Sequence, residues 1–162
     1  MIEIRALADL RDRLGQEIAV SDWLPITQER IDKFAEATDD HQWIHVDRAR
    51  AAASPFKTTI AHGFLTLSLV SLLLRQTIAF PPLRMAINYG VNRVRFMSPL
   101  PAGSRVRAHI SPAAVEDIGG GIQVTWSVTI EREGSAKPAA TVEWVVRYYL
   151  AAEGTEGAER TD

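Results

Sequence analysis

The spacing of hydrophobic and polar residues changes about half-way along this chain. Up to about residue 80 the apolar residues recur mostly at helical intervals, and from residue 84 they alternate with polar ones. The clearest alternation runs from Ile122 to Ile130, where every second side chain is apolar, as in a strand with one buried face. The pattern therefore predicts helices followed by a run of long strands.

The first half is predicted to hold one long helix and several shorter elements. The long helix runs from about His62 to Ile78 and is apolar almost all round, so we expect it to be buried on most faces. A second helix is expected to begin after Thr27, which is a good N-cap, and to end near residues 39–40. The shorter elements are an amphipathic helix over 4–14, a weak strand over 17–25, an irregular segment over 41–46 and a short helix over 48–53 capped by Asp47.

The second half is predicted to be a set of antiparallel strands. The expected strands are 84–97, with Gly90 as a bulge or bend, 104–116, 122–130 and 141–150. Turns rich in glycine and proline separate them. A sheet of successive hairpins packed on one apolar helix is an α+β arrangement. Its open edges can be covered by a second copy of the chain.

Length and composition favour one globular domain. The chain has 162 residues, of which 46% are hydrophobic and 23% charged, and this is ordinary for a folded domain. We expect a single domain over residues 1–151 and a disordered tail over 152–162. The formal charge of −2 contains no block of either sign, so nothing indicates nucleic acid or an anionic membrane as a partner.

Cysteine is absent from the chain, and this excludes several kinds of site. Disulfides, cysteine-based zinc sites and a thiol nucleophile are ruled out, and a reducing compartment is compatible with the composition. The longest uncharged and mostly apolar run, 64–74, is well short of the roughly 20 residues that a membrane span needs. The first 15 residues carry charges throughout, unlike a secretory signal. We therefore expect a cytoplasmic protein without a membrane span.

Candidate chemistry is concentrated between residues 34 and 68, which hold three of the four histidines. Asp40 and His45 fall in the predicted irregular segment, where their side chains can converge on one water molecule. Such a pair can take a proton from the water and deliver a proton to a substrate carbon. An acid at a helix end and an unrelated loop histidine explain the same spacing, so spacing alone leaves both interpretations open.

Gly63 follows His62 at the start of the long helix. Its N–H is one of the unpaired donors of a helix N-terminus, and without a β-carbon it lets an acyl carbonyl approach closely. Close packing between helix and sheet explains the glycine equally well. We expect His62 to cap or pack, His41 to be exposed, and His109 to lie in a strand without an acidic neighbour in sequence.

Several separated blocks resemble one family. The segment 34–45, FAEATDDHQWIH, resembles the hydratase-2 motif of the MaoC-like dehydratase family, in a form close to its nodulation-protein-N-like branch. Further blocks are similar to the family's helix entry and to its later strand and turn: 60–68 (IAHGFLTLS), 88–96 (NYGVNRVRF) and 101–106 (PAGSRV). The resemblance covers roughly residues 15–150.

Two positions depart from that motif. Asp39 stands where the motif has glycine, and aspartate is among the few residues that tolerate a positive φ if this position needs one. Gln42 and Trp43 replace Asn-Pro, which removes a rigid turn residue but agrees with the branch. Neither departure removes the pair formed by Asp40 and His45.

The resemblance implies a hot-dog fold, in which a curved antiparallel sheet wraps a long central helix, and a homodimer whose sheets join edge to edge. The implied activity is that of an (R)-specific enoyl-CoA hydratase, a hydro-lyase that adds water reversibly to trans-2-enoyl-CoA to give (3R)-hydroxyacyl-CoA. By motif position, Asp40 and His45 activate the water and the backbone of Gly63 binds the thioester oxygen. Gln42 orients the pair or the water, and His62 has a supporting role. No metal or redox cofactor is implied, and coenzyme A is part of the acyl-CoA substrate.

Two other functions fit the same residues. A hot-dog acyl-CoA thioesterase uses its carboxylate against the thioester carbonyl, and release of free coenzyme A distinguishes it. A non-catalytic acyl-CoA-binding or assembly subunit is the third possibility, although the presence of both Asp40 and His45 argues against it. Acyl chain length, and coenzyme A against acyl-carrier protein as the carrier, are left open by the sequence.

Overall fold

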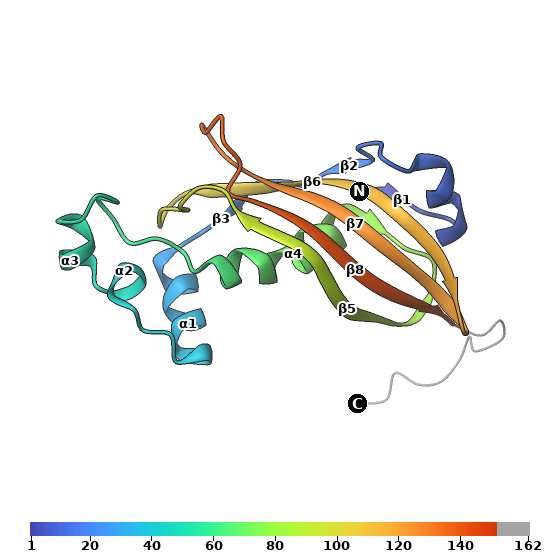
Figure 1. Ribbon diagram of the computed structural model, residues 1–162, viewed down its shortest axis with the longest axis horizontal. Coiled ribbons are helices and arrows are strands. Elements are labelled where there is room, and N and C mark those ends of the chain that lie inside the picture. Colours follow the sequence, from blue (N-terminus) through green and yellow to red (C-terminus); the bar gives the residue numbers. More distant parts are fainter. Residues whose placement is uncertain (152–162) are drawn as a thin grey trace, which may run out of the picture.

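The computed structural model describes residues 1–151, so the tail predicted over 152–162 lies outside the described residues. Figure 1 shows a curved sheet of long strands along one side of helix α4 (Gly63–Thr77), with three shorter helices grouped beyond one end of it. The three are α1 (Gln28–Thr38), α2 (Trp43–Val46) and α3 (Arg48–Ala52). A sheet wrapped on one long helix is the arrangement expected for a hot-dog fold.

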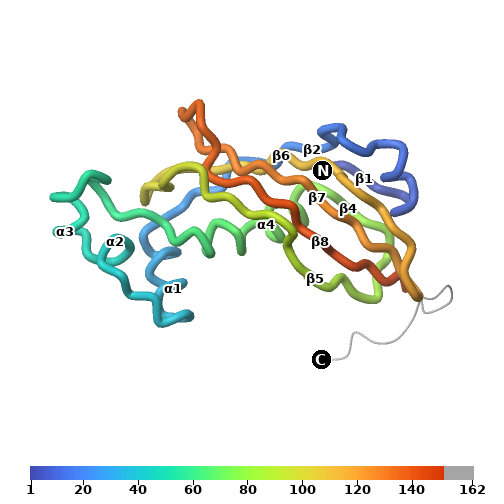
Figure 2. The backbone as a smooth tube through the Cα atoms, viewed as in Figure 1, coloured from blue at the N-terminus to red at the C-terminus, as the bar shows by residue number. Residues whose placement is uncertain are grey.

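The main sheet has six strands in antiparallel pairs, and four of the strands are long. Figure 2 shows the long strands in the order β5, β8, β7, β6. Their bounds are β5 (Leu83–Phe96), β6 (Arg105–Ile118), β7 (Gly121–Arg132) and β8 (Ala140–Leu150). The short strands β2 (Ala19–Val20) and β3 (Leu24–Pro25) both pair with β6, so the weak strand predicted over 17–25 is two strands. A separate parallel pair joins β1 (Ile2–Glu3) to β4 (Ile78–Ala79).

The sequence suggested a sheet built from a simple series of hairpins, and the observed sheet differs from this. Strands β6, β7 and β8 are joined in order, but β5 pairs with β8 rather than with β6. The segment between β5 and β6 therefore crosses the sheet, and β5 becomes an edge strand. The bulge predicted at Gly90 is confirmed by a register shift between Asn88 and Gly90. The register also shifts between Pro112 and Ala114, and β6 continues through this shift.

The helix caps agree with the sequence predictions. The Thr27 hydroxyl accepts the N–H of Arg30 at 3.2 Å, and the Asp47 carboxylate accepts the N–H of Arg50 at 2.9 Å. Two details differ. The predicted amphipathic helix is the 3₁₀ helix η1 (Leu7–Arg13), and the segment predicted to be irregular contains the one-turn helix α2.

The core lies between α4 and the concave face of the sheet. Five apolar side chains of α4 are buried there: Leu65, Leu69, Val70, Leu73 and Leu74. Each buried side chain of this size stabilises the fold by roughly 1.5–3 kcal/mol. The buried indole of Trp126 donates its N–H to the Tyr148 hydroxyl at 2.9 Å, so these two polar groups of the core satisfy each other. One stripe of α4 stays exposed, with Phe64 at 68%.

Among residues 1–151, no helix has both the length and the apolar character that crossing a membrane requires.

Candidate active site

A left-handed residue at the end of α1 turns the chain into the candidate site. Asp39 is the C-cap of α1 and has φ of 55°, so the conformation that the motif glycine would provide is present and aspartate adopts it. Asp40 follows in the loop, and the single turn of α2 brings His45 back towards it. The α2 turn is closed by a hydrogen bond from the Asp47 N–H to the Trp43 carbonyl at 3.0 Å.

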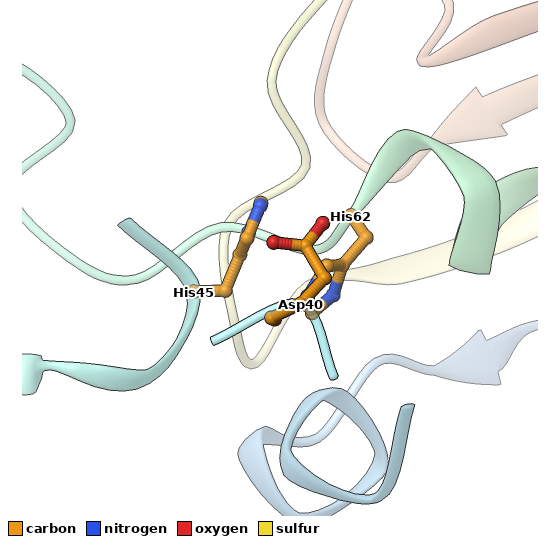
Figure 3. A group of neighbouring side chains, drawn as sticks. All are labelled: Asp40, His45 and His62. Atoms are coloured by element: carbon orange, nitrogen blue, oxygen red, sulfur yellow. The ribbon is translucent and has the colours of Figure 1, made fainter. Parts of the chain in front are cut away.

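Three side chains from three parts of the chain meet beyond this turn. The carboxylate of Asp40 and ring nitrogens of His45 and His62 lie within 4.8 Å of one another (Figure 3). Asp40 belongs to the loop after α1, His45 to α2 and His62 to the N-cap of α4. The structure therefore brings together the predicted catalytic pair and adds a second histidine to it.

His45 is fixed in one tautomer by a backbone carbonyl. Its Nδ1 lies 2.7 Å from the Ile60 oxygen, and because a carbonyl can only accept, Nδ1 carries the proton. The Nε2 lone pair is then free to accept a proton. Burial lowers the pKa of His45 below its ordinary value of 6.5, and the neighbouring His62 acts in the same direction, while Asp40 and the Ile60 carbonyl oppose it. His45 is therefore a neutral base at neutral pH.

His62 supports both members of the pair. Its ring stacks on His45, with centroids 3.7 Å apart and planes 25° apart, and Phe34 covers it at 5.0 Å. Its Nε2 donates to the backbone carbonyl of Asp40 at 2.9 Å. The side chain is buried, and within the described chain its Nδ1 has no hydrogen-bond partner. His62 thus occupies the N-cap position of α4 without a side-chain cap hydrogen bond, and it packs, the second of the two expected roles, so that it holds the backbone of Asp40 and the ring plane of His45.

Within residues 1–151, Asp40, His45 and His62 are the group of side chains that lie close enough together to hold a metal ion. His45 Nδ1 and His62 Nε2 each face a backbone carbonyl, which leaves one ring nitrogen of each histidine free within the described chain. Histidines held in this way are compatible with proton transfer and with metal binding.

Gly63 lies on the wall of the same pocket as His45. This pocket, of about 320 Å³, is closed on the other side by Thr66, Phe96 and the segment 97–100. A β-carbon on Gly63 would lie 2.8 Å from ring carbons of Phe96, so any other residue here would displace that exposed ring. Gly63 is also the first residue of α4, where the N–H groups have no partner within the helix. The sequence left two explanations for Gly63, close packing and an N–H that binds a carbonyl. Both are compatible with its position.

The residue that positions the loop is Gln28 rather than Gln42. The side chain of Gln42 is exposed and has no hydrogen bond in the described structure, and only its N–H approaches Asp40 Oδ1, at 3.5 Å. Gln28, in contrast, donates to the His45 carbonyl at 2.8 Å and accepts from the hydroxyl of Thr59. Sequence reasoning missed Gln28 because it looks like an ordinary surface residue in the first turn of α1.

A family model described as a MaoC like domain matches residues 9–133. This chain belongs to the MaoC-like dehydratase family. The resemblance carried by residues 34–45 is thereby confirmed.

Members of this MaoC-like family with known names are similar over nearly the whole chain. A 3-hydroxyacyl-thioester dehydratase Z of Mycobacterium tuberculosis is 54% identical over 91% of this chain and 99% of its own. A Nodulation protein N of Rhizobium leguminosarum bv. viciae is 48% identical over 86% of this chain and 89% of its own.

Solved structures confirm the hot-dog fold of this MaoC-like chain. The (R)-hydratase from A. caviae involved in PHA biosynthesis covers 85% of this chain and 100% of its own at 27% identity, with a TM-score of 0.63. The R-hydratase PhaJ1 from Pseudomonas aeruginosa covers 92% of both chains with a TM-score of 0.69, and at 22% identity this likeness bears on the fold alone.

Proposed function

We propose that this protein is a metal-independent (R)-specific enoyl-CoA hydratase that adds water reversibly to trans-2-enoyl-CoA to give (3R)-hydroxyacyl-CoA. The observation that carries the proposal is the neutral His45, whose free Nε2 lies in one site with the Asp40 carboxylate and the N-terminus of α4. The names of the relatives, a hydroxyacyl-thioester dehydratase and an (R)-hydratase, agree with this reaction class.

The groups of the site have separate roles in the proposed reaction. Asp40 and His45 hold one water molecule, and His45 Nε2 takes a proton from it as the oxygen bonds to the substrate β-carbon. The α-carbon receives a proton from the pair, so one water is consumed, one C=C double bond becomes single, and the enzyme is unchanged. The Gly63 N–H donates to the thioester oxygen, where negative charge develops in the transition state.

We also propose that the protein forms a homodimer along β5. This edge strand exposes a row of apolar side chains: Met85, Ile87, Tyr89 and Val91. An exposed apolar sheet edge is a ready template for pairing with another chain. A second copy placed there would extend the sheet and cover this surface.

The test of the activity is to change Asp40→Asn and to assay hydration of crotonyl-CoA and of a longer enoyl-CoA. We expect the rate to fall by a factor of roughly 10²–10⁴, because the amide lacks the carboxylate charge that helps to hold the water beside His45. The matched control is Asp47→Asn. Asp47 is a nearby carboxylate that caps α3, and asparagine is an equally good N-cap, so this variant should keep the wild-type rate.

Three outcomes would contradict the proposal. Hydration at the wild-type rate in the Asp40→Asn variant would remove the carboxylate from the mechanism. Release of free coenzyme A by the wild-type protein, without hydration, would identify a thioesterase. Binding of acyl-CoA without turnover at any chain length would identify a non-catalytic subunit.

A further inference from the structure

Two further hollows lie beside α4, beyond the pocket that contains His45. One is lined by Leu67, Val70 and Val91, and the other, of about 430 Å³, by Leu74, Phe80 and Leu83. Both share the same three wall residues, Ser71, Asn88 and Trp144, so they adjoin each other. Neither hollow is used by the proton chemistry described above.

The pocket and the two hollows follow one another along one face of α4, and this row of hollows is the groove. Successive turns of the helix supply one wall, with Gly63 and Thr66 in the first section and Arg75 in the last. Strand β5 supplies the opposite wall in reverse order, from Phe96 at the first section to Leu83 at the last. The twelve helical steps from Gly63 to Arg75 correspond to about 18 Å at the helical rise of 1.5 Å per residue. An acyl group held by its thioester at Gly63 is therefore directed towards Arg75.

The far section of the groove ends at a positive charge. Its floor is apolar, with Trp144, Val146 and Tyr148 buried in the sheet. Arg75 lies on its wall, is exposed, and forms no ion pair with any residue that the structure describes. Its Nε donates only to the Ser71 carbonyl, at 3.4 Å. Most of the planar guanidinium is therefore free for a ligand.

An arginine at the far end of the groove does not strengthen the binding of a plain hydrocarbon chain. It does strengthen the binding of a carboxylate, because the guanidinium presents paired N–H donors that match the two carboxylate oxygens. Asn88 shares the wall of this section and has no side-chain hydrogen bond among residues 1–151, so it adds a second polar group to the same place.

We propose that the groove accepts acyl groups that carry a carboxylate towards their far end, and that Arg75 is the residue that selects them. This inference rests on the proposed hydratase function, which places the thioester at Gly63. The substrate class is then a trans-2-enoyl thioester of a dicarboxylic acid, or of a similar acid whose distal part is anionic.

The experiment compares matched pairs of trans-2-enoyl-CoA thioesters, one ending in a methyl group and the other in a carboxylate, over medium to long chains. The quantity measured is the ratio of their kcat/KM values. We expect the wild-type ratio to favour the carboxylate at one range of lengths, and Arg75→Met to lower that ratio by about tenfold or more. Arg75→Lys should keep part of the preference. Arg13→Met removes an exposed arginine of η1 that is distant from Arg75 in sequence and does not line the groove, and it should leave the ratio unchanged.

Binding of the corresponding saturated acyl-CoA pairs, measured by calorimetry, separates this inference from the proposed function. A carboxylate preference in binding that is lost in Arg75→Met supports the inference even if no hydration occurs. Hydration of methyl-ended substrates without a preference at any length would overturn the inference and leave the hydratase function intact. A wild-type preference that survives in Arg75→Met would also overturn it.

Discussion

Two of the histidine–carboxylate clusters in the described part of the chain behave in opposite ways. His45 lies near Asp40 on the core side of the molecule, whereas His109 of β6 lies on the outer face of the sheet between Glu17 and Glu131. His109 Nδ1 is 2.8 Å from Glu17 and its Nε2 is 2.7 Å from Glu131. His109 has no acidic neighbour in sequence, and both carboxylates are brought to it by the fold.

The two histidines shift their pKa values in opposite directions for identifiable reasons. Partial burial lowers the pKa of His109, but the hydrogen bonds and charges of Glu131 and Glu17 outweigh burial, so the pKa is raised. For His45 burial is the largest effect and the single nearby carboxylate does not compensate it, so the pKa is lowered.

The difference supports His45 rather than the more strongly paired His109 as the proposed base. Each ring nitrogen of His109 contacts a carboxylate, and Arg107 Nε also donates to Glu131 Oε2 at 2.6 Å. This cluster is therefore an ionic network in which both ring nitrogens are already paired. His45 keeps one nitrogen free, and that ring lies on a pocket wall. An available lone pair beside a space for substrate is what chemistry requires.

The sharpest way to break this comparison is to make the same change in both clusters. His45→Gln removes the base, and we expect kcat/KM for enoyl-CoA hydration to fall by roughly 10²–10⁴-fold. His109→Gln should keep the rate within about twofold of wild type, because its cluster lies on the face of the sheet away from α4. Equal losses in the two variants would show that the rate depends on the stability of the sheet rather than on the base.

The pH dependence of the rate sharpens the comparison further. His45 must be neutral to accept a proton, and its lowered pKa places the loss of activity below pH 6.5. We expect kcat/KM to fall with a midpoint below pH 6.5, and to approach a loss of about tenfold per pH unit below that midpoint. Circular dichroism over the same range checks that the fold is retained. A midpoint above pH 6.5 would mean that a group other than His45 controls the acid limb.

Much of the fold was predictable because its elements are long and regular. The apolar period of α4 and the alternation in β7 extend over many residues, and both elements are found close to their predicted bounds. The site pair of Asp40 and His45 was also predictable, from a local motif whose loop geometry depends on nearby residues such as Asp39.

What the sequence could not show depends on contacts between distant parts of the chain. The pairing of β5 with β8 is set by the crossing over the sheet and not by any local pattern. The Ile60 carbonyl that fixes the tautomer of His45 is 15 residues away, and Glu17 is 92 residues from His109. The groove that ends at Arg75 exists only once α4 lies against β5.

The smallest expected effect is on stability, and it concerns the outer cluster. Because folding raises the pKa of His109, its contribution to the free energy of unfolding is present below pH 6.5 and is lost as pH rises through the folded value. The groups are partly exposed, with side-chain exposure of 27% for His109 and 29% for Glu131, so the contribution should not exceed about 1 kcal/mol. Urea unfolding of wild type and His109→Gln at pH 6 and pH 8 measures it, since the difference between the two proteins removes the opposite contribution of His45. The difference should be larger at pH 6, and equal differences at both pH values would show that the two carboxylates do not hold the imidazolium in the folded protein.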